Sequence, residues 1–323
     1  MNHKIKTISV LTSGGDAPGM NAAVRAVVRT AAAQNIKVVA INRGYHGMIE
    51  GEFKDYTSED VKNIIQRGGT KIKTARSEEF KTKEGREKAY KNLEKHQVDA
   101  CIVIGGDGTF RGASIFSQEY DIPFVGIPGT IDNDMFGTDY TIGYDTCLNT
   151  VTEAIDRIKD TASAHDRTFF IEVMGRDAGF IALNAGIATG AEAILIPEVE
   201  GQEEQLKEIL QKSDKRSKII IVAEGNNLGG AEKIAKKMKA ELGLTNMRVN
   251  VLGHMQRGGS PTAFDRFLAS RLGVAAVDAL TDNQRSIMVG YSNHEVAHIP
   301  FNKTIKGKRT LNEELLRVAK LLS

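Results

Sequence analysis

Three apolar segments of the sequence each run directly into a turn that combines glycine with a carboxylate. Cys101–Thr109 is the clearest case, and the same construction recurs at Ile8–Asp16 and Phe124–Asp134. Glycine has no Cβ atom, so backbone N–H groups in such turns can approach phosphate oxygens closely. In an open α/β sheet the loops that follow parallel strands gather at one edge. The sequence therefore predicts a nucleotide site that faces an acid–base site.

Composition and charge are those of an ordinary globular enzyme. The 323 residues suffice for one large or two ordinary domains, and the contents of 41% hydrophobic and 26% charged residues are near average. The formal net charge of +2 gives no dominant basic field, which argues against a general nucleic-acid binder. No signal-peptide core and no apolar run near the ~18 residues of a membrane helix is present. We expect a cytoplasmic protein without a nucleic-acid or membrane partner, in which Cys101 and Cys147 are small buried hydrophobes.

Predicted strands and helices alternate along almost the whole chain, which is typical of a parallel sheet covered on both faces. The predicted strands are Thr7–Thr12, Lys37–Asn42, Ala100–Ile104, Pro123–Ile127, Thr168–Val173, Ala193–Pro197, Lys218–Ala223 and Arg248–Leu252. The predicted helices are Pro18–Gln34, Glu84–His96, Gly179–Thr189, Glu203–Ser213 and Ala231–Leu242, with further helices that start at Thr57, Cys147, Pro261 and a capping box at Thr310–Glu313. The pattern restarts after about residue 145, so we expect two α/β domains.

Polar residues that suit phosphate chemistry follow several predicted strands. Thr130–Asp134 carries two carboxylates two residues apart; if it is extended, both point to one side, and one acts as a base while the other holds a cation. The alternative is an Asx-rich turn. His254–Pro261 supplies His, Gln, Arg, two glycines and a helix N-terminus, which together form an anion site. Arg176 offers a planar fork to a phosphate or, alternatively, a surface ion pair to Asp177.

Five motifs occur along the chain in a specific order: Thr12–Asn21, Gly105–Thr109, Pro128–Asp134, Met174–Arg176 and Gly253–Ser260. Together they closely resemble bacterial 6-phosphofructokinases, although the second motif alone also resembles lipid kinases and NAD kinases. That family transfers the γ-phosphoryl group of Mg-ATP to the 1-hydroxyl of fructose 6-phosphate, the committed step of glycolysis. The resemblance implies two Rossmann-like three-layer domains with mainly parallel sheets and an active site in the cleft between them. It implies a larger ATP-binding domain of residues 1–142 plus 255–305 and a smaller fructose 6-phosphate-binding domain of residues 143–254 plus 306–323.

The resemblance also assigns roles residue by residue. Asp132 matches the base that takes the sugar hydroxyl proton, Asp107 matches the magnesium position, and Thr130, Asp134 and Arg176 complete the catalytic set. The positions that match ATP contacts are Gly15, Arg76, Ser77, Gly106, Asp107, Gly108 and Thr109. The positions that match sugar-phosphate contacts are Thr130, Ile131, Asp132, Arg167, Met174, Gly175, Arg176, Glu224, Arg248, His254, Met255, Gln256 and Arg257. In the family Arg167 and Arg248 reach in from a neighbouring subunit, which implies a homotetramer with shared active sites.

Two further positions bear on the phosphoryl donor, and another group bears on regulation. Pyrophosphate-using relatives usually carry Asp and Lys where this chain has Gly108 and Gly129, so the resemblance favours ATP.

Candidate positions for an ADP or phosphoenolpyruvate effector are Arg25, Arg29, Lys159, Glu192, Lys215 and Arg216, although Arg25 and Arg29 alone would usually be a solvated helix face. Glu52, Lys159, Ser213 and Ser217 depart from the family's basic residues, and Glu52 would repel an anion. We expect weak regulation.

Other functions remain open on the sequence. They are a kinase for a different sugar phosphate, a pyrophosphate-dependent enzyme, and a nucleotide-binding regulatory subunit without catalysis. The last is disfavoured because Asp107, Asp132 and Arg176 are all present. A dinucleotide dehydrogenase is disfavoured because no Gly-x-Gly-x-x-Gly follows the first strand.

Overall fold

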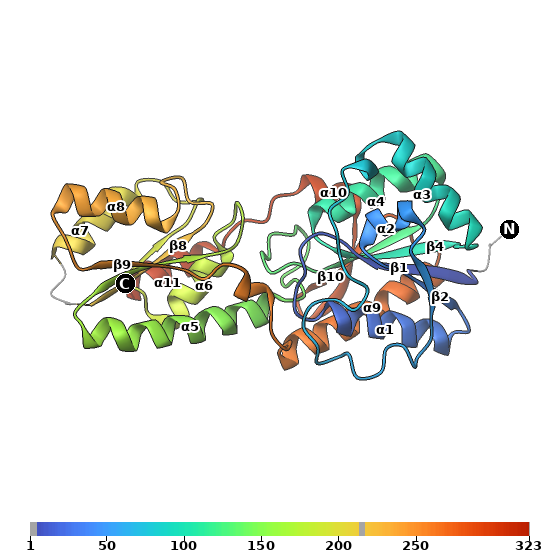
Figure 1. Ribbon diagram of the computed structural model, residues 1–323, viewed down its shortest axis with the longest axis horizontal. Helices are drawn as coiled ribbons and strands as arrows, with labels where there is room; N and C mark the ends of the chain where they lie inside the picture. Colours follow the sequence, from blue (N-terminus) through green and yellow to red (C-terminus); the bar gives the residue numbers. More distant parts are fainter. Residues whose placement is uncertain (1–4, 213–216, 323) are drawn as a thin grey trace. The chain divides into compact units, whose positions relative to one another are not determined.

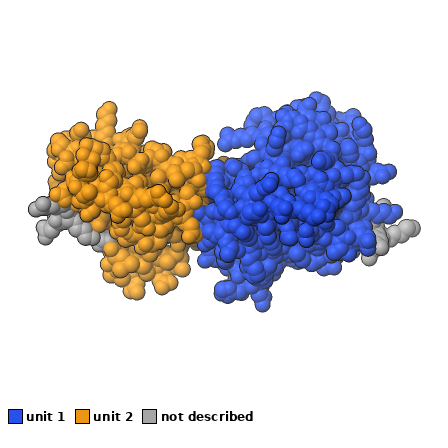
Figure 2. Space-filling view, turned by 60° about the horizontal axis from the view of Figure 1, so that its bottom comes forward, with its two compact units in different colours: residues 1–131, 135–146, 257–309 blue, residues 132–134, 147–256, 310–323 orange. Residues whose placement is uncertain are grey.

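The computed structural model describes residues 5–212 and 217–322, which form two compact α/β units (Figures 1 and 2). Unit 1, blue in Figure 2, comprises Met1–Ile131, Met135–Thr146 and Arg257–Arg309. Unit 2, orange, comprises Asp132–Asp134, Cys147–Gln256 and Thr310–Ser323. Strands and helices alternate in both units, and the predicted α/β class is confirmed.

Unit 1 is built on a seven-stranded sheet in the order β11-β10-β5-β4-β1-β2-β3. The strands are β1 (Thr7–Thr12), β2 (Lys37–Ile41), β3 (Phe53–Tyr56), β4 (Ala100–Gly105), β5 (Phe124–Pro128), β10 (Ile287–Ser292) and β11 (Glu295–Pro300). The five inner strands run parallel, and β3 and β11 close the edges as antiparallel strands. Because β1, β4 and β5 are neighbours, the loops at their carboxyl ends lie next to one another.

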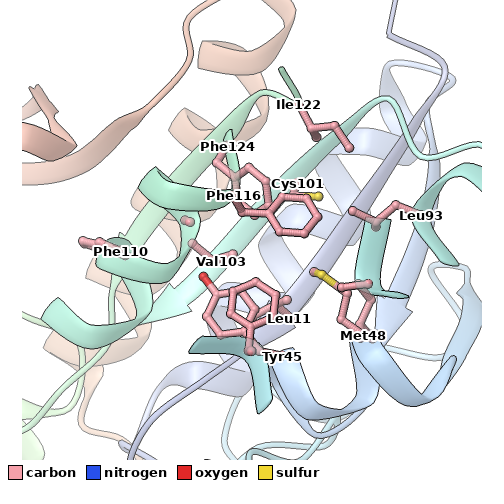
Figure 3. Packing of buried hydrophobic residues seen from close by; sticks show 14 of the residues in the cluster. Leu11, Tyr45, Met48, Leu93, Cys101, Val103, Phe110, Phe116, Ile122 and Phe124 are labelled. Carbon is pink, nitrogen blue, oxygen red and sulfur yellow. The ribbon is translucent and has the colours of Figure 1, made fainter. Parts of the chain in front are cut away.

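The helices of unit 1 pack on both faces of this sheet (Figure 1). They are α1 (Met20–Ala33), α2 (Gly44–Glu50), α3 (Lys83–Lys95), α4 (Asp107–Tyr120), α9 (Ala263–Thr281) and α10 (Phe301–Lys306), with a short 3₁₀ turn η1 (Glu79–Lys81). On one face an aromatic core gathers Tyr45, Phe110, Phe116 and Phe124 around Cys101 (Figure 3). Both cysteines are buried, as predicted, and burial raises the pKa of Cys101 to about 12.

Unit 2 has a smaller, fully parallel sheet in the order β7-β8-β6-β9. Its strands are β6 (Thr168–Val173), β7 (Ala193–Leu195), β8 (Lys218–Ala223) and β9 (Met247–Val251), and the 3₁₀ turn η2 (Gly253–Arg257) follows β9. Its helices are α5 (Tyr144–Ala164), α6 (Phe180–Thr189), α7 (Gln202–Lys212), α8 (Ala231–Leu242) and α11 (Glu313–Leu322). In Figure 1, α7 and α8 cover one face of the sheet and α5 and α6 the other.

Two predicted helix starts are wrong. The segment after Thr57 forms consecutive turns, and Asn63 adopts a left-handed φ of 54°, which an α-helix cannot continue through. Val61 and Ile64 are nevertheless buried. The last helix is capped by Asn312, whose Oδ1 accepts from the N–H of Glu314 at 2.8 Å, rather than by a box that starts at Thr310.

Candidate active site

The three glycine loops predicted to meet do meet at the carboxyl edge of the unit 1 sheet. Ser13 N donates to Ile104 O (2.9 Å), and Gly129 N donates to Gly105 O (3.0 Å). The Thr109 hydroxyl donates to Ser13 O at 3.2 Å. A Cβ atom on residue 105 would overlap both Ser13 O and Thr109 Oγ1, so only glycine permits this approach. The sequence therefore places a glycine-rich surface where β1, β4 and β5 end.

The N-terminus of α4 points at this surface. Gly106 caps the helix, and Asp107 and Gly108 form its first turn. A Cβ atom on residue 108 would meet nothing within 4 Å, so the first turn of α4 faces open space. Free N–H groups and the positive end of the helix dipole favour an anion there. The Asp107 carboxylate is partly exposed and lies 3.1 Å from Arg111 Nη2, a surface pair of the kind that contributes about 0–1 kcal/mol.

The segment that carries Arg76 and Ser77 is attached to the same edge. The hydroxyl of Thr12, the last residue of β1, donates to Lys73 O at 2.8 Å, and the hydroxyl of Thr74 donates to Gly14 O at 2.7 Å. Ser77 Oγ accepts from Phe80 N at 3.2 Å, which ties Ser77 to η1. The candidate ATP residues thus share one edge of unit 1.

Arg257 lies on the first glycine loop. Its Nη1 donates to Asp16 O at 3.2 Å, and its guanidinium occupies the space that a Cβ atom on Gly15 would need. The structure therefore brings together two residues that the sequence analysis assigns to different substrates. The guanidinium adds a positive charge to the glycine loop.

Thr130–Asp134 follows β5 and is buried at its centre. Thr130 is 8% exposed and Asp132 is 3% exposed. Asn133 adopts a left-handed φ of 52°, so the segment is not extended. The expectation that both carboxylates point to one side depends on an extended segment, and that condition is not met. Thr130 and Ile131 belong to unit 1, whereas Asp132–Asp134 belong to unit 2.

A second cluster forms at the carboxyl edge of the unit 2 sheet. Arg176 N donates to Glu224 Oε1 (2.8 Å), and Met174 N donates to the fully buried Gln256 at Oε1 (3.1 Å). Gly175 has a φ of 138°, a conformation that an L side chain rarely adopts. The Arg176 side chain is exposed. These residues come from the loops after β6, β8 and β9, and the two hydrogen bonds join them at one edge of the sheet.

Two candidate arginines lie at the opposite end of that sheet. Arg167 directly precedes β6, and Arg248 pairs with Phe169 in the register of β6 and β9. Because β6 advances roughly 3.3 Å per residue, about 20 Å separates Arg167 from Met174. The fold does not bring Arg167 and Arg248 to the edge that carries Arg176. His254 and Met255 are exposed on η2, next to Gln256.

The candidate effector residues divide between the two units. Arg25 and Arg29 lie on α1 of unit 1, where partial burial and the charge of Arg29 lower the pKa of Arg25. In unit 2, Lys159 donates to Thr189 O, and Glu192 accepts from Ile219 N at 2.7 Å. Lys215 and Arg216, and also Ser213, lie outside the described residues.

No preformed metal cluster occurs in residues 5–212 and 217–322, where no three His, Cys, Asp or Glu side chains could hold an ion together. None of the helices in these residues is long and apolar enough to cross a membrane.

Two buried polar residues, Thr141 and Asp265, carry no sequence motif that marks them as functional. The spacing of Thr262 and Asp265 at the start of α9 is the one sequence signal that involves Asp265, and it is typical of an ordinary helix cap.

Comparison with known proteins gives a consistent result. The family model described as Phosphofructokinase matches residues 7–280. The chain is 53% identical over 322 residues to ATP-dependent 6-phosphofructokinase 2 of Bacteroides thetaiotaomicron, covering 99% of each chain. It is 54% identical to ATP-dependent 6-phosphofructokinase 1 of Thermus thermophilus, covering 99% of this chain and all of the relative. Among solved structures, Saccharomyces cerevisiae phosphofructokinase aligns with a TM-score of 0.87 and 40% identity, over 98% of this chain and 46% of that one.

A more distant solved structure supports the fold alone. The pyrophosphate-dependent phosphofructokinase from Marinobacter aquaeolei aligns with a TM-score of 0.85 at 23% identity, over 98% of this chain and 91% of that one. The backbone is therefore shared with a protein of low sequence identity.

Proposed function

The chain belongs to the phosphofructokinase family, and we propose that it is an ATP-dependent 6-phosphofructokinase that phosphorylates the 1-hydroxyl of fructose 6-phosphate. The observation that carries the proposal is the junction of three glycine loops and the α4 N-terminus at one edge of unit 1. The full-length relatives named above support it. We further propose that the protein works in the cytoplasm, where its substrates are made.

ATP would bind to the edge of unit 1. The backbone of Gly106–Thr109 and the first turn of α4 would receive its phosphates, and Arg76 would add a cation from the attached segment. Asp107 suits magnesium: it is a partly exposed carboxylate beside open space, paired only at the surface with Arg111, and Mg²⁺ in kinases takes one or two carboxylates together with phosphate oxygens and water. When bound, the ion would neutralise charge on the transferring phosphoryl group.

Asp132 would act as the base. It would accept the proton of the sugar 1-hydroxyl as that oxygen attacks the γ-phosphorus and the bond to the ADP oxygen breaks. Burial keeps water away from its carboxylate, which strengthens its interaction with a proton donor. The hydroxyl of Thr130 and the guanidinium of Arg176 would stabilise the charge that develops on the phosphoryl oxygens, and Asp134 would support the base.

Two glycines support ATP over pyrophosphate. A side chain on residue 108 would project into the open space at the start of α4. A Cβ atom on residue 129 would lie 3.0 Å from Ile104 Cγ2 and 3.2 Å from Met20, so the chain leaves little room for a longer side chain there. Gly108 therefore keeps clear space that a nucleotide could use, and the packing around Gly129 opposes the longer side chain that pyrophosphate-using relatives carry there.

Fructose 6-phosphate would bind to the cluster in unit 2. Glu224 and the backbone of Met174–Arg176 would hold the sugar, and His254 would bind the 6-phosphate. Arg257, which the resemblance assigns to the same phosphate, lies in unit 1 on the first glycine loop. Because Arg167 lies about 20 Å from Met174 along β6, and Arg248 pairs with Phe169 near the same end of the sheet, we propose that both arginines serve the site of a second copy in a homotetramer. Ile131, Met255 and Gln256 would line the sugar pocket.

A coupled assay tests the proposal directly. The purified protein is supplied with fructose 6-phosphate and either ATP or pyrophosphate, and ADP or phosphate release is followed. We expect turnover with ATP and Mg²⁺ and little with pyrophosphate. Glucose 6-phosphate and fructose 1-phosphate serve as alternative acceptors. Faster turnover with either of them, or with pyrophosphate, would contradict the proposal.

A further inference from the structure

A continuous run of hydrogen bonds begins at Asp265, a completely buried residue of α9. Its Oδ1 accepts from Gly143 N at 2.8 Å. Its Oδ2 accepts from Thr146 N (2.8 Å) and from the Thr146 hydroxyl (2.5 Å). The carboxylate therefore caps the first turn of α5, where a negative charge is favourable, and fixes the residues that lead into that helix.

The residues that Asp265 holds are themselves bonded to the segment after β5. Ile142 N donates to Pro128 O at 3.0 Å, and Ile142 forms a parallel bridge with Gly129. The Thr141 hydroxyl donates to Thr130 O at 2.6 Å, and Thr141 is completely buried. Residues 141–143 thus lie between the Asp265 carboxylate and Pro128–Thr130.

The same residues are packed tightly against the loop after β1. A Cβ atom on Gly19 would lie 2.6 Å from Ile142 Cγ2, and a Cβ atom on Gly143 would lie 2.7 Å from the Cβ of Ala17. Neither approach would be possible with a larger residue. Close packing transmits displacement, so a shift of residues 141–143 would reach both the first glycine loop and Thr130.

We propose that Asp265 and Thr141 are positioning residues that form a brace, residues 141–143 plus Asp265, which holds Thr130 in register for phosphoryl transfer. This inference rests on the proposed function. Neither residue needs to touch a substrate, since they act on the backbone of Pro128–Thr130. Displacing a reacting group by about 1 Å can cost 10²-fold in rate, so the brace affects turnover more than nucleotide binding.

A matched set of variants at one loop tests the proposal. Thr141→Val removes the hydroxyl with little change in shape, and Thr141→Ser keeps it. Thr138→Val is the control, because Thr138 lies in the same loop, is 4% exposed, and donates to Tyr140 O (2.8 Å) rather than to Thr130. We expect Thr141→Val to lower kcat by about tenfold or more with the KM for ATP within about threefold, whereas Thr141→Ser and Thr138→Val keep kcat within about threefold.

Asp265→Asn tests the other end of the brace. It keeps the size of the side chain but replaces one acceptor oxygen with a donor that faces an N–H group. We expect the same loss of kcat, and we expect the double variant with Thr141→Val to lose little more than the worse single variant, because both act through one run of bonds.

Hydrogen exchange separates failure of the brace from failure of the proposed function. If the parent protein does not phosphorylate fructose 6-phosphate, the proposed function is wrong, but the amides of residues 129–131 should still exchange faster in Thr141→Val than in Thr138→Val. Parent-like kcat and exchange in folded Thr141→Val would overturn the brace. An equal loss of kcat in Thr138→Val would overturn it too, because a merely structural role would affect both threonines.

Discussion

Arg43 binds both carboxylate oxygens of Glu52, one through Nε at 2.8 Å and the other through Nη2. The hydrogen bond to Arg43 lowers the pKa of Glu52, and the same bond raises the pKa of Arg43. Glu52 is the residue that departs from the basic pattern of the effector candidates. Arg43 therefore neutralises the charge of Glu52, and Arg43 itself is less available to bind any other anion. The fork geometry favours this pairing over a single-point contact.

We therefore expect phosphoenolpyruvate at millimolar concentration to change the fructose 6-phosphate saturation curve only slightly. Glu52→Arg should strengthen the response, because it removes a carboxylate and leaves two guanidinium groups for an anion. Glu52→Gln should give an intermediate response by releasing Arg43. The measurement is the Hill coefficient and half-saturation point with and without phosphoenolpyruvate. Strong sigmoidal inhibition of the parent protein at micromolar phosphoenolpyruvate would show that this interpretation is wrong.

Asp132→Asn should lower turnover by about 10²–10⁴-fold and leave both substrates able to bind. The amide keeps the size of the carboxylate but cannot accept the hydroxyl proton as a base. Steady-state kinetics give the loss of kcat, and equilibrium titration with ATP and with fructose 6-phosphate shows retained binding. A kcat within a few-fold of the parent would remove Asp132 from the role of base.

Mixed subunits test whether Arg167 and Arg248 serve a neighbouring site. Asp132→Asn and Arg248→Ala proteins should each be nearly inactive. When they are dissociated, mixed and reassembled, some sites regain both Asp132 and Arg248 from different chains, and part of the activity should return. Reassembly of each variant alone is the control. If hybrids form, as shown by native mass spectrometry, and no activity returns, each chain builds its own site.

The buried carboxyl of Asp265 should leave a signature in the pH dependence of stability. Burial raises its pKa from 3.8 to about 6, opposed by the hydrogen bonds from Thr146 and Gly143, and Asp145 raises it further. The folded state therefore holds this proton more tightly than the unfolded chain. The contribution of this carboxyl to the free energy of unfolding is greatest below about pH 4. It falls by roughly 3 kcal/mol as the pH rises to about 6, with no further change above pH 7.

Asp265→Asn removes this titrating carboxyl, so a comparison of parent and variant isolates its contribution to the pH dependence of stability. The free energy of unfolding is measured by urea titration at several pH values between 4 and 8 for both proteins. The free energy of unfolding of the parent minus that of the variant should fall as the pH rises from 4 to about 6 and should then stay constant. A difference that is flat across the whole range would mean that Asp265 is ionised in the folded protein at low pH.

The sequence predicts those parts of the fold that depend on neighbouring residues. The strand Thr7–Thr12 is found at its predicted bounds, and the loops after β1, β4 and β5 meet as expected, because apolar β-branched runs and glycine turns are local signals. Helix α4 is not predicted, since it starts at Asp107 with glycines at 108 and 112, which are poor helix formers. Packing of Phe110 and Phe116 in the core stabilises it instead.

The parts of the candidate site that depend on distant residues cannot be predicted in this way. Arg257 lies on Gly15, and Asp265 caps Gly143, although more than a hundred residues separate each pair. Hairpin β10–β11 is not predicted either, because Asn293 and His294 both have positive φ, and His is an unusual residue for such a turn. These features follow from tertiary packing, which a single sequence does not show.

The division of the chain between the units also sets the order in which the protein can fold during synthesis. Strand β10 pairs directly with β5, yet about 160 residues, including most of unit 2, are translated between them. At roughly 5–20 residues per second, the ribosome needs about 10–30 s to supply β10. Throughout that time the apolar edge of β5 is without its native partner and exposed to other chains. Unit 2, whose sheet is contiguous in sequence, can close first, so we expect the half-finished sheet of unit 1 to be the part of the nascent chain most open to pairing with other chains.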